Sequence, residues 1–363
     1  MNSIDTPLTR LLGIRRPILL AGMAGGPTTP ELVAAVSRAG GLGVFGLAGM
    51  QPDAVHSAVR AAVEMSGGAP VGVNVLISPE IARPGANPAR MDAVLAGMRA
   101  RMGLPHPPLP PPPAASPREL AEAGIDAGAS VVATGLGDPS AVADIARAAG
   151  APLIAMASTV QDAVRMVQSG ADAVVAQGSE AGGHRSNIDV PEDSAVPLVG
   201  TLALVRQVVR AVDVPVVAAG GIMDGAGVAA ALALGATGAQ LGTAFLVADE
   251  AGVPPGWRGR LRDATDDGTV ITRSLSGRPA RGLPNAITRA LDVPGALGWP
   301  GQNAATADVR RAAAAADDPD HMALWAGQAA ALAGPDRPAR RIMDSLIDEA
   351  RATMQRLGEM AAR

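Results

Sequence analysis

Residues 214–246 read VPVVAAGGIMDGAGVAAALALGATGAQLGTAFL. The apolar run at 216–219 is followed by a Gly-Gly pair, an alanine-rich stretch and a second apolar run at 238–241 that ends in Gly-Thr. Continuous apolar runs suit parallel strands that are covered on both faces, and the stretch between them suits a crossover helix. Residues 225–248 are uncharged, but five glycines make them too weakly hydrophobic for a membrane span. The segment predicts a buried strand, helix and strand.

The same pattern recurs along most of the chain. We count eight short apolar runs, each followed by a turn and then by an alanine-rich stretch, at residues 17–20, 42–45, 71–76, 130–133, 153–157, 173–177, 216–219 and 238–241. Crossover helices are expected at 30–39, which opens with proline and is closed by Gly40, and at 201–212, which opens with threonine. Eight units in about 245 residues predict an α/β fold, a closed (β/α)8 TIM barrel, since open doubly wound sheets more often stop at five or six strands.

Two segments fall outside the repeat. Residues 78–117 follow the third strand, with an expected helix at 89–102 and then PHPPLPPPP, which ends at Pro113 and predicts an extended polyproline connector or, alternatively, a ligand for a proline-binding module. Beyond the last strand we expect helices at 303–316, 321–333 and 337–360. We therefore predict a barrel domain of residues 1–77 and 118–248. We predict a small helical cap over its mouth, formed by the insertion at 78–117 and the C-terminal segment at 249–363.

The composition excludes several classes of protein. The chain has 363 residues, a net charge of −4 and only five aromatic side chains, so it lacks the basic face and stacking rings of a nucleic-acid-binding protein. The absence of cysteine excludes disulfides, thiolate metal sites and cysteine nucleophiles. All 30 basic residues are arginine, which excludes Schiff-base chemistry on lysine. Four widely spaced histidines make a metal site improbable. The first twenty residues lack the features of a signal peptide, so we expect a cytoplasmic enzyme with no membrane association.

Glycine-rich turns follow four of the predicted strands. They are AGMAGG at 21–26, GSEAGGH at 178–184, GGIMDG at 220–225 and GTAF at 242–245. In a TIM barrel these turns meet at the carboxyl ends of the strands, where the active site lies, and the loops after the seventh and eighth strands commonly bind phosphate. Each turn alone could be only a tight turn. Four at one face predict a cofactor that carries phosphate.

These residues carry a resemblance to a known family. The opening AGMAGGPTTPELVAAVSRAGGLGVFG, the third-strand VGVNVL, ADAVVAQGSEAGGH, the stretch at 214–246 and SGRPARGLPN at 276–285 resemble the nitronate monooxygenases, formerly called 2-nitropropane dioxygenases. The likeness spans almost the whole barrel. The combination of AQGSEAGGH with AGMAGG is more specific than the GGI and GT turns, which many flavin and nucleotide barrels share.

The resemblance implies non-covalent FMN at the barrel mouth and assigns residues to it. Gly22, Met23 and Ala24 would line the flavin, and Asn74 and Gln177 would hydrogen-bond it. Gly182 and Gly183 would approach the ribityl-phosphate side. The phosphate would be bound by Gly220, Gly221, Gln240, Gly242 and Thr243. Asn74 and Gln177 are also amides within apolar strands, so either a ligand or an internal network must satisfy them.

His184 is the predicted catalytic residue. It follows the sixth strand and its glycine turn, and imidazole titrates near neutrality, which suits proton transfer beside a carbon acid. His56, His106 and His321 are interpreted as structural. The characterised bacterial branch of the family uses tyrosines and a lysine around the substrate, and this chain has neither. Substrate contacts are therefore sought, from sequence position only, at Trp257, Trp299, Trp325, Met156 and Arg281.

The leading functional hypothesis is an FMN-dependent monooxygenase that oxidises a nitronate with O₂ to a carbonyl compound and nitrite. The rival is a reductase on the same scaffold, similar to flavin enoyl-acyl-carrier-protein or quinone reductases, in which NAD(P)H reduces FMN. A non-catalytic flavin-binding barrel is the third possibility. Barrels of the inosine-monophosphate dehydrogenase kind need a cysteine, which this chain lacks. The expected partner is a small carbon acid, and the sequence specifies no oligomeric state.

Overall fold

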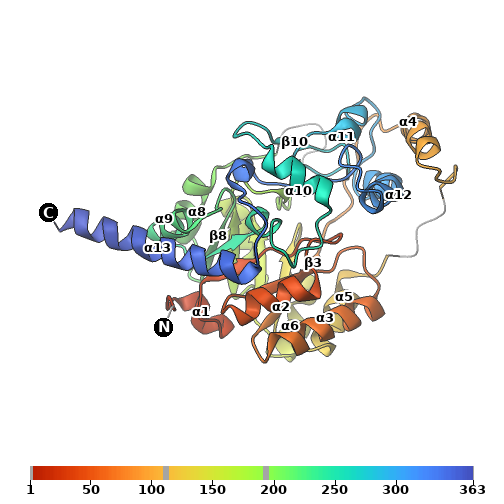
Figure 1. The fold of residues 1–363 in the computed structure, drawn as a ribbon. Helices are drawn as coiled ribbons and strands as arrows, with labels where there is room; N and C mark the ends of the chain where they lie inside the picture. The colour runs from red at the N-terminus through yellow and green to blue at the C-terminus, as the bar shows by residue number, and fades with distance from the viewer. Residues whose placement is uncertain (1–2, 109–113, 191–195, 363) are drawn as a thin grey trace.

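A closed ring of parallel strands forms the centre of the molecule (Figure 1). The computed structural model describes residues 3–108, 114–190 and 196–362. The barrel strands in these ranges are β1 (Ile18–Leu20), β2 (Gly43–Gly46), β3 (Val71–Leu76), β4 (Val131–Gly135), β5 (Leu153–Ala157), β6 (Ala173–Gln177), β8 (Val216–Ala219) and β9 (Gly238–Leu241). They pair in the order β1-β9-β8-β6-β5-β4-β3-β2. A parallel bridge between Leu19 and Leu42 then joins β1 to the β2 side and closes the ring. The predicted TIM barrel is confirmed.

Successive side chains along a strand enter two different hydrophobic layers. Leu19, Val175 and Val217 belong to the cluster inside the barrel, whereas their neighbours Val174 and Val216 belong to the cluster between barrel and helices. This alternation follows from the two-residue period of a strand. Both faces are covered, which explains why the sequence shows continuous apolar runs rather than alternation.

Helices surround the barrel. α1 (Pro7–Leu12) packs Leu8 and Leu12 against the interior cluster. The outer helices are α2 (Pro30–Arg38), α3 (Pro52–Ser66), α5 (Pro117–Asp126), α6 (Ser140–Ala148), α7 (Val160–Gln168), α8 (Thr201–Val209) and α9 (Gly225–Ala233). None of the described helices is both long and apolar enough to cross a membrane.

The last helix lies in the outer ring and not in the cap. We expected residues 337–360 to contribute to the cap, but α13 (Ala339–Ala361) packs between α9 and α2, the position of the eighth barrel helix (Figure 1). The physical reason is its apolar face, since Ile342, Leu346 and Ile347 are buried in the main hydrophobic cluster. The chain therefore leaves the barrel after β9, builds the cap and returns.

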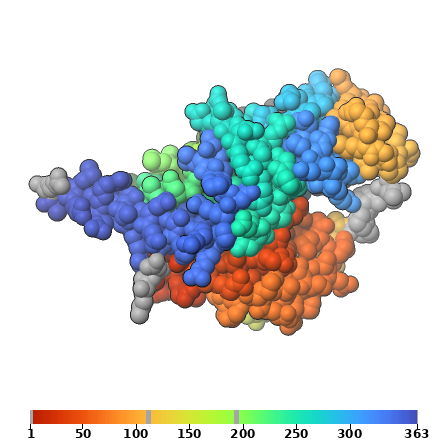
Figure 2. Space-filling model, in the orientation of Figure 1, coloured from red at the N-terminus to blue at the C-terminus, as the bar shows by residue number. Residues whose placement is uncertain are grey.

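The cap is built from both segments that interrupt the repeat. It contains α4 (Pro88–Arg101), α10 (Pro255–Arg262), α11 (Ala286–Ala290), α12 (Gly301–Ala315), η2 (Gln328–Leu332) and the strands β10 (Val270–Thr272) and β11 (Ala280–Gly282). Two short elements of the barrel loops adjoin it: β7 (Gly183–His184), which completes a three-stranded antiparallel sheet with β10 and β11, and η1 (Thr243–Phe245), which directly follows β9. α4 packs against α12, and both contribute to a separate hydrophobic cluster that includes Met91, Leu95 and Val309. Figure 2 shows the surface of the insertion beside that of the C-terminal segment.

The expected cap helices are confirmed in part. α4 and α12 match the helices predicted at 89–102 and 303–316. The prediction of a helix at 321–333 is wrong, because most of that segment is irregular. It pairs with the cap sheet through the Gly282–Trp325 bridge and ends in the short η2. Residues 109–113 of the polyproline run lie outside the described residues. The boundaries between barrel and cap remain our proposal.

The docking of the insertion on the C-terminal segment is tested at Arg99. Its side chain is 1% exposed, and its Nε donates to Asp308 Oδ2 at 2.8 Å while Nη2 donates to the Ala305 carbonyl at 2.8 Å. Arg99→Met leaves Asp308 without its partner, so we expect a loss of about 2–4 kcal/mol of cap stability. Hydrogen exchange should accelerate in α4 and α12 but not in the barrel strands.

The matched control is Arg165→Met, which breaks an exposed pair with Asp189. Exposed ion pairs contribute little, so its exchange pattern should match that of the wild type. Equal effects of the two substitutions would show that the Arg99 contacts do not hold the insertion in place.

Candidate active site

The residues expected to bind the cofactor lie at one edge of the barrel. Met23 and its neighbours follow β1, Gln177 ends β6, and the pairs Gly220–Gly221 and Gly242–Thr243 follow β8 and β9. Asn74 lies near the end of β3, and the Gly22 backbone approaches it so closely that a Cβ on Gly22 would be 2.6 Å from the Asn74 Cβ. The carboxyl ends of parallel strands form the functional face of a TIM barrel, so all of these residues share that face.

The buried amides of the barrel mouth differ in their partners. Gln177 is satisfied internally, because its Oε1 accepts from Ser158 Oγ (2.8 Å) and the Ser186 N–H (2.9 Å) while its Nε2 donates to the His184 carbonyl (2.9 Å). Among the described residues, the side chains of Asn74 and Gln240 have no hydrogen-bond partner. Asn74 is only 8% exposed. A polar ligand would satisfy these two amides.

Backbone donors gather where a phosphate is expected. Within the described parts of the chain, the N–H groups of Gly221, Gly242 and Thr243 donate to no protein acceptor. Gly220 and Gly221 have φ angles of 111° and 73°, a conformation that suits glycine and that turns successive N–H groups toward one side. Gly242 is open enough that an added Cβ would lie 3.4 Å from Ala21 Cβ. The donor set fits an anion.

The two glycines before His184 have different surroundings. A Cβ on Gly182 would lie 2.6 Å from the Gly327 nitrogen, so this glycine permits close packing of the cap. Gly183 has φ of 76° and nothing within 4 Å of its added Cβ, which leaves space beside it. Their predicted contacts with the cofactor remain a prediction.

A short strand in the cap fixes the position of His184. In β7, Gly183 pairs with Arg281 and His184 pairs with Ala280 of β11. The buried Arg185 donates from Nη1 to the Gly178 carbonyl (2.6 Å) and from Nη2 to the Gln177 carbonyl (3.1 Å), and Arg281 Nε donates to the Ser179 carbonyl (2.8 Å). The glycine turn after β6 is therefore tied at both of its ends.

The His184 ring lies among polar, aromatic and cationic groups. Its Nε2 is 2.9 Å from Ser276 Oγ, and its ring centroid is 5.7 Å from that of Trp299 and 5.5 Å from that of Trp325. Burial, together with the positive charges of Arg278 and Arg310, lowers the pKa of His184 to about 3. The imidazole is therefore neutral at physiological pH.

Arg278 and Arg310 lie near His184 in the candidate site, and the sequence analysis did not select either of them. Arg278 is fully buried and bonds to Ser78 Oγ, the Leu136 carbonyl and the Arg185 carbonyl, so it connects loops after β3, β4 and β6. Burial lowers the pKa of each guanidinium to about 10, and both remain charged. The available signal was SGRPARG, whose arginines stand among small residues in a segment that resembles the family.

The candidate substrate contacts separate into two groups. Trp299 and Trp325 lie against His184, and Arg281 holds the turn before it. Trp257 is buried in the main hydrophobic cluster of the molecule, and Met156 packs against the interior of the barrel. The structure thus brings two of the three tryptophans to the histidine.

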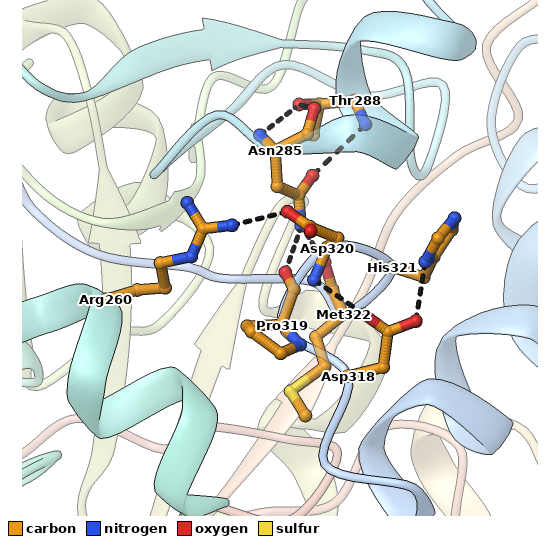
Figure 3. A network of polar contacts seen from close by, with 8 residues as sticks. All are labelled: Arg260, Asn285, Thr288, Asp318, Pro319, Asp320, His321 and Met322. Carbon is orange, nitrogen blue, oxygen red and sulfur yellow. Dashed lines mark hydrogen bonds and ion pairs between the residues drawn. The ribbon is translucent and has the colours of Figure 1, made fainter.

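Figure 3 shows a polar network in the cap around residues 318–322. Asn285 Nδ2 donates to the carbonyls of Pro319 and Met322, each at 2.8 Å, and its Oδ1 caps α11. Arg260 pairs with Asp320, and His321 Nδ1 lies 2.6 Å from Asp318 Oδ2. The network fixes the segment that leads to Trp325, which gives the last residue of SGRPARGLPN a structural role.

The fold is that of a TIM-barrel enzyme with free backbone donors at its mouth, and the comparisons with known proteins identify its family. The model of the nitronate monooxygenase family matches residues 5–349, and the chain belongs to that family. A probable nitronate monooxygenase of Staphylococcus aureus (strain Newman) is 36% identical over 354 residues, covering 96% of this chain and 98% of the relative. The protein is therefore an oxidoreductase of a flavin-dependent family.

Two solved structures are similar over nearly the full length. Nitroalkane oxidase from Streptomyces ansochromogenes has a TM-score of 0.84 and 36% identity, covering 97% of this chain and all of the other. FabK from Thermotoga maritima has a TM-score of 0.78 and 30% identity, covering 99% of this chain and all of the other.

No cluster of three acidic or histidine side chains suited to a metal occurs in the described ranges, and the expectation of no metal remains a prediction.

The depressed pKa of His184 predicts a pH dependence of stability. Between pH 6.5 and pH 3 the unfolded chain binds a proton that the folded protein does not, so stability falls as the pH decreases through this window. At pH 5 this effect lowers the free energy of unfolding by about 2 kcal/mol relative to neutral pH. Denaturant unfolding of His184→Gln at pH 7 and pH 5 should show that this part of the dependence is lost. Replacing the exposed His56 by Gln is the control, and a His184 variant with the wild-type slope would contradict the prediction.

Proposed function

We propose that this chain binds FMN at the barrel mouth and oxidises nitronates with O₂ to a carbonyl compound and nitrite. The observation that carries the proposal is the place of His184, which lies against two tryptophans with two arginines nearby and next to loops with free backbone donors; burial and the arginine charges keep its pKa low. A nitronate is an anion that has already lost its acidic proton. The positive charges favour its binding, and a weakly basic imidazole does not need to deprotonate it.

Different residues of the barrel mouth would bind different parts of the cofactor. The free N–H groups of Gly221, Gly242 and Thr243 would hold the phosphate, and the amides of Asn74 and Gln240 would hydrogen-bond the polar parts of the ligand. Met23 would line the ring, which is consistent with its place after β1. When bound, the flavin supplies the redox chemistry by accepting electrons from the substrate and passing them to O₂.

The protein supplies position and charge. Trp299 and Trp325 lie against His184 and would limit the access of water to it. With a neutral nitroalkane, His184 would take the proton from the carbon next to the nitro group, and the electron pair of that bond would remain on the nitronate. With a preformed nitronate this step is absent, and His184 would only donate or accept a hydrogen bond.

The second candidate is an NAD(P)H-dependent reductase. The observation that supports this candidate is the similarity to the FabK structure, at 30% identity over nearly the whole chain. Anaerobic mixing of the yellow protein with NADH and, separately, with a nitronate distinguishes the two. Rapid bleaching by NADH alone would favour the reductase.

The cofactor prediction is tested by colour and by one substitution. The purified protein should be yellow and release FMN rather than FAD on heating. In Gly242→Val the added side chain would occupy the space above Ala21 and Met23, where the backbone must approach the phosphate, so we expect FMN affinity to fall at least about tenfold. Fluorescence titration of the apoprotein measures it.

Gly259→Ala is the matched control, because Gly259 lies in α10 of the cap and its added Cβ meets nothing within 4 Å. FMN should bind this variant as it binds the wild type. A colourless protein that gains no 450 nm band with FMN would refute the cofactor proposal, and unchanged affinity in Gly242→Val would place the phosphate elsewhere.

The role of His184 is tested by His184→Asn. We expect the variant to keep its fold and its flavin but to lose at least about a hundredfold in kcat/KM with a neutral nitroalkane, because a positioned proton acceptor contributes on the order of 10²- to 10⁴-fold. The loss with a preformed nitronate should be smaller. If the variant loses FMN but turns over normally once reconstituted, His184 is a cofactor-loop residue and another group transfers the proton.

A further inference from the structure

Ser276 makes more contacts than its single hydroxyl hydrogen can serve. The side chain is 1% exposed, and its Oγ lies 2.9 Å from His184 Nε2, 3.1 Å from the Arg278 carbonyl oxygen and 3.3 Å from the Arg278 nitrogen. The Arg278 N–H can only donate, so it uses a lone pair of Oγ. The hydroxyl hydrogen must therefore go either to the Arg278 carbonyl or to His184.

The surrounding bonds decide between these two arrangements. Among the described residues, no other donor reaches the Arg278 carbonyl, whereas His184 Nε2 can carry its own proton and donate to Oγ. If the hydroxyl donated to His184 instead, a buried carbonyl would lose its only partner, which is costly. The arrangement that satisfies every group has Ser276 donating to the carbonyl and accepting from His184.

We propose that Ser276 is a positioning residue that selects the Nε2–H tautomer of His184 and so leaves Nδ1 as the proton acceptor. Nδ1 has no hydrogen-bond partner in the described parts of the protein, which leaves its lone pair available to a substrate. The assignment of Nδ1 to substrate rests on the proposed function, whereas the tautomer itself does not. A residue 92 positions further along the chain therefore sets the tautomer of the histidine.

The proton inventory is consistent with this assignment. When a neutral nitroalkane reacts, its C–H bond breaks, the proton binds Nδ1 and the electron pair remains on the nitronate. The imidazolium that forms keeps its Nε2–H bond to Ser276 Oγ, whose hydroxyl continues to donate to the Arg278 carbonyl. No hydrogen in this chain has to change partners during the transfer.

The tautomer is measured directly in the unmodified, flavin-loaded protein. Nitrogen NMR of protein labelled with ¹⁵N-histidine at pH 7 separates protonated from unprotonated ring nitrogens, and comparison with His184→Asn assigns the His184 signals. We expect a protonated Nε2 and an unprotonated Nδ1. A protonated Nδ1 in the wild type would overturn the proposal without any variant of Ser276.

Variants of Ser276 test its effect on the reaction. In Ser276→Ala we expect a mixed or reversed tautomer and a tenfold or greater loss of kcat with a neutral nitroalkane, with KM and the rate on a preformed nitronate changed less than threefold. Ser276→Thr retains a hydroxyl and should restore both the tautomer and kcat. Ser274→Ala is the control, since this buried hydroxyl two residues away bonds to Thr272 and not to His184.

The outcomes separate this proposal from the proposed function. If Ser276→Ala keeps the wild-type tautomer, or if Ser274→Ala gives the same kinetic loss, Ser276 does not position His184. If the predicted tautomer is found but the wild type oxidises neither nitro substrate, the positioning stands and the proposed reaction fails.

Discussion

The functional face depends on one interaction, the attachment of the glycine turn after β6 to the cap. Six residues separate Gln177 from His184, and most of them are small, so a free turn would sample many conformations. The β7–β11 pairing and the buried guanidiniums of Arg185, Arg278 and Arg281 remove that freedom by binding backbone carbonyls of the barrel loops. The cap therefore completes the active site and does not merely cover it.

The same attachment sets the electrostatics of the site. In the described parts of the chain, none of these three arginines forms a salt bridge with a carboxylate, and their guanidiniums bind backbone carbonyls instead. The carboxylate of Glu180 still interacts electrostatically with Arg185 and Arg281. Hydrogen bonds from charged donors are strong enough to keep such groups buried, and arginine stays charged where a buried lysine would lose its proton. In this chain without lysine, the buried cations near the barrel mouth are arginines, which keep their charge. Burial is the main cause of the low pKa of His184, and the positive charges of Arg278 and Arg310 lower it further.

Local patterns in the sequence predict the barrel well, and tertiary contacts explain what they miss. The strand runs, the glycine turns and the place of His184 follow from periodicity and motif. The helix expected at 321–333 does not form, because Leu324 and Trp325 pair with the cap sheet. Gln177 has the same appearance in the sequence as Asn74, yet the first is satisfied internally and the second is not. Ser276 and Arg278 lie in the SGRPARG segment, but their roles exist only once residues about ninety positions apart are brought together.

The arrangement also bears on why such a site would act on a nitronate in preference to its parent nitroalkane. A proton acceptor works best when its pKa is near the pH at which it operates, and a histidine with a pKa of about 3 is far below that range. Burial is the main cause of this low basicity and the charges of Arg278 and Arg310 add to it, while Arg278 is also the residue that joins three barrel loops to the cap. The same arginine thus holds the loops of the site together and keeps His184 a weak base in cationic surroundings. A substrate that arrives as an anion benefits from both, because it needs no deprotonation and gains from the positive potential.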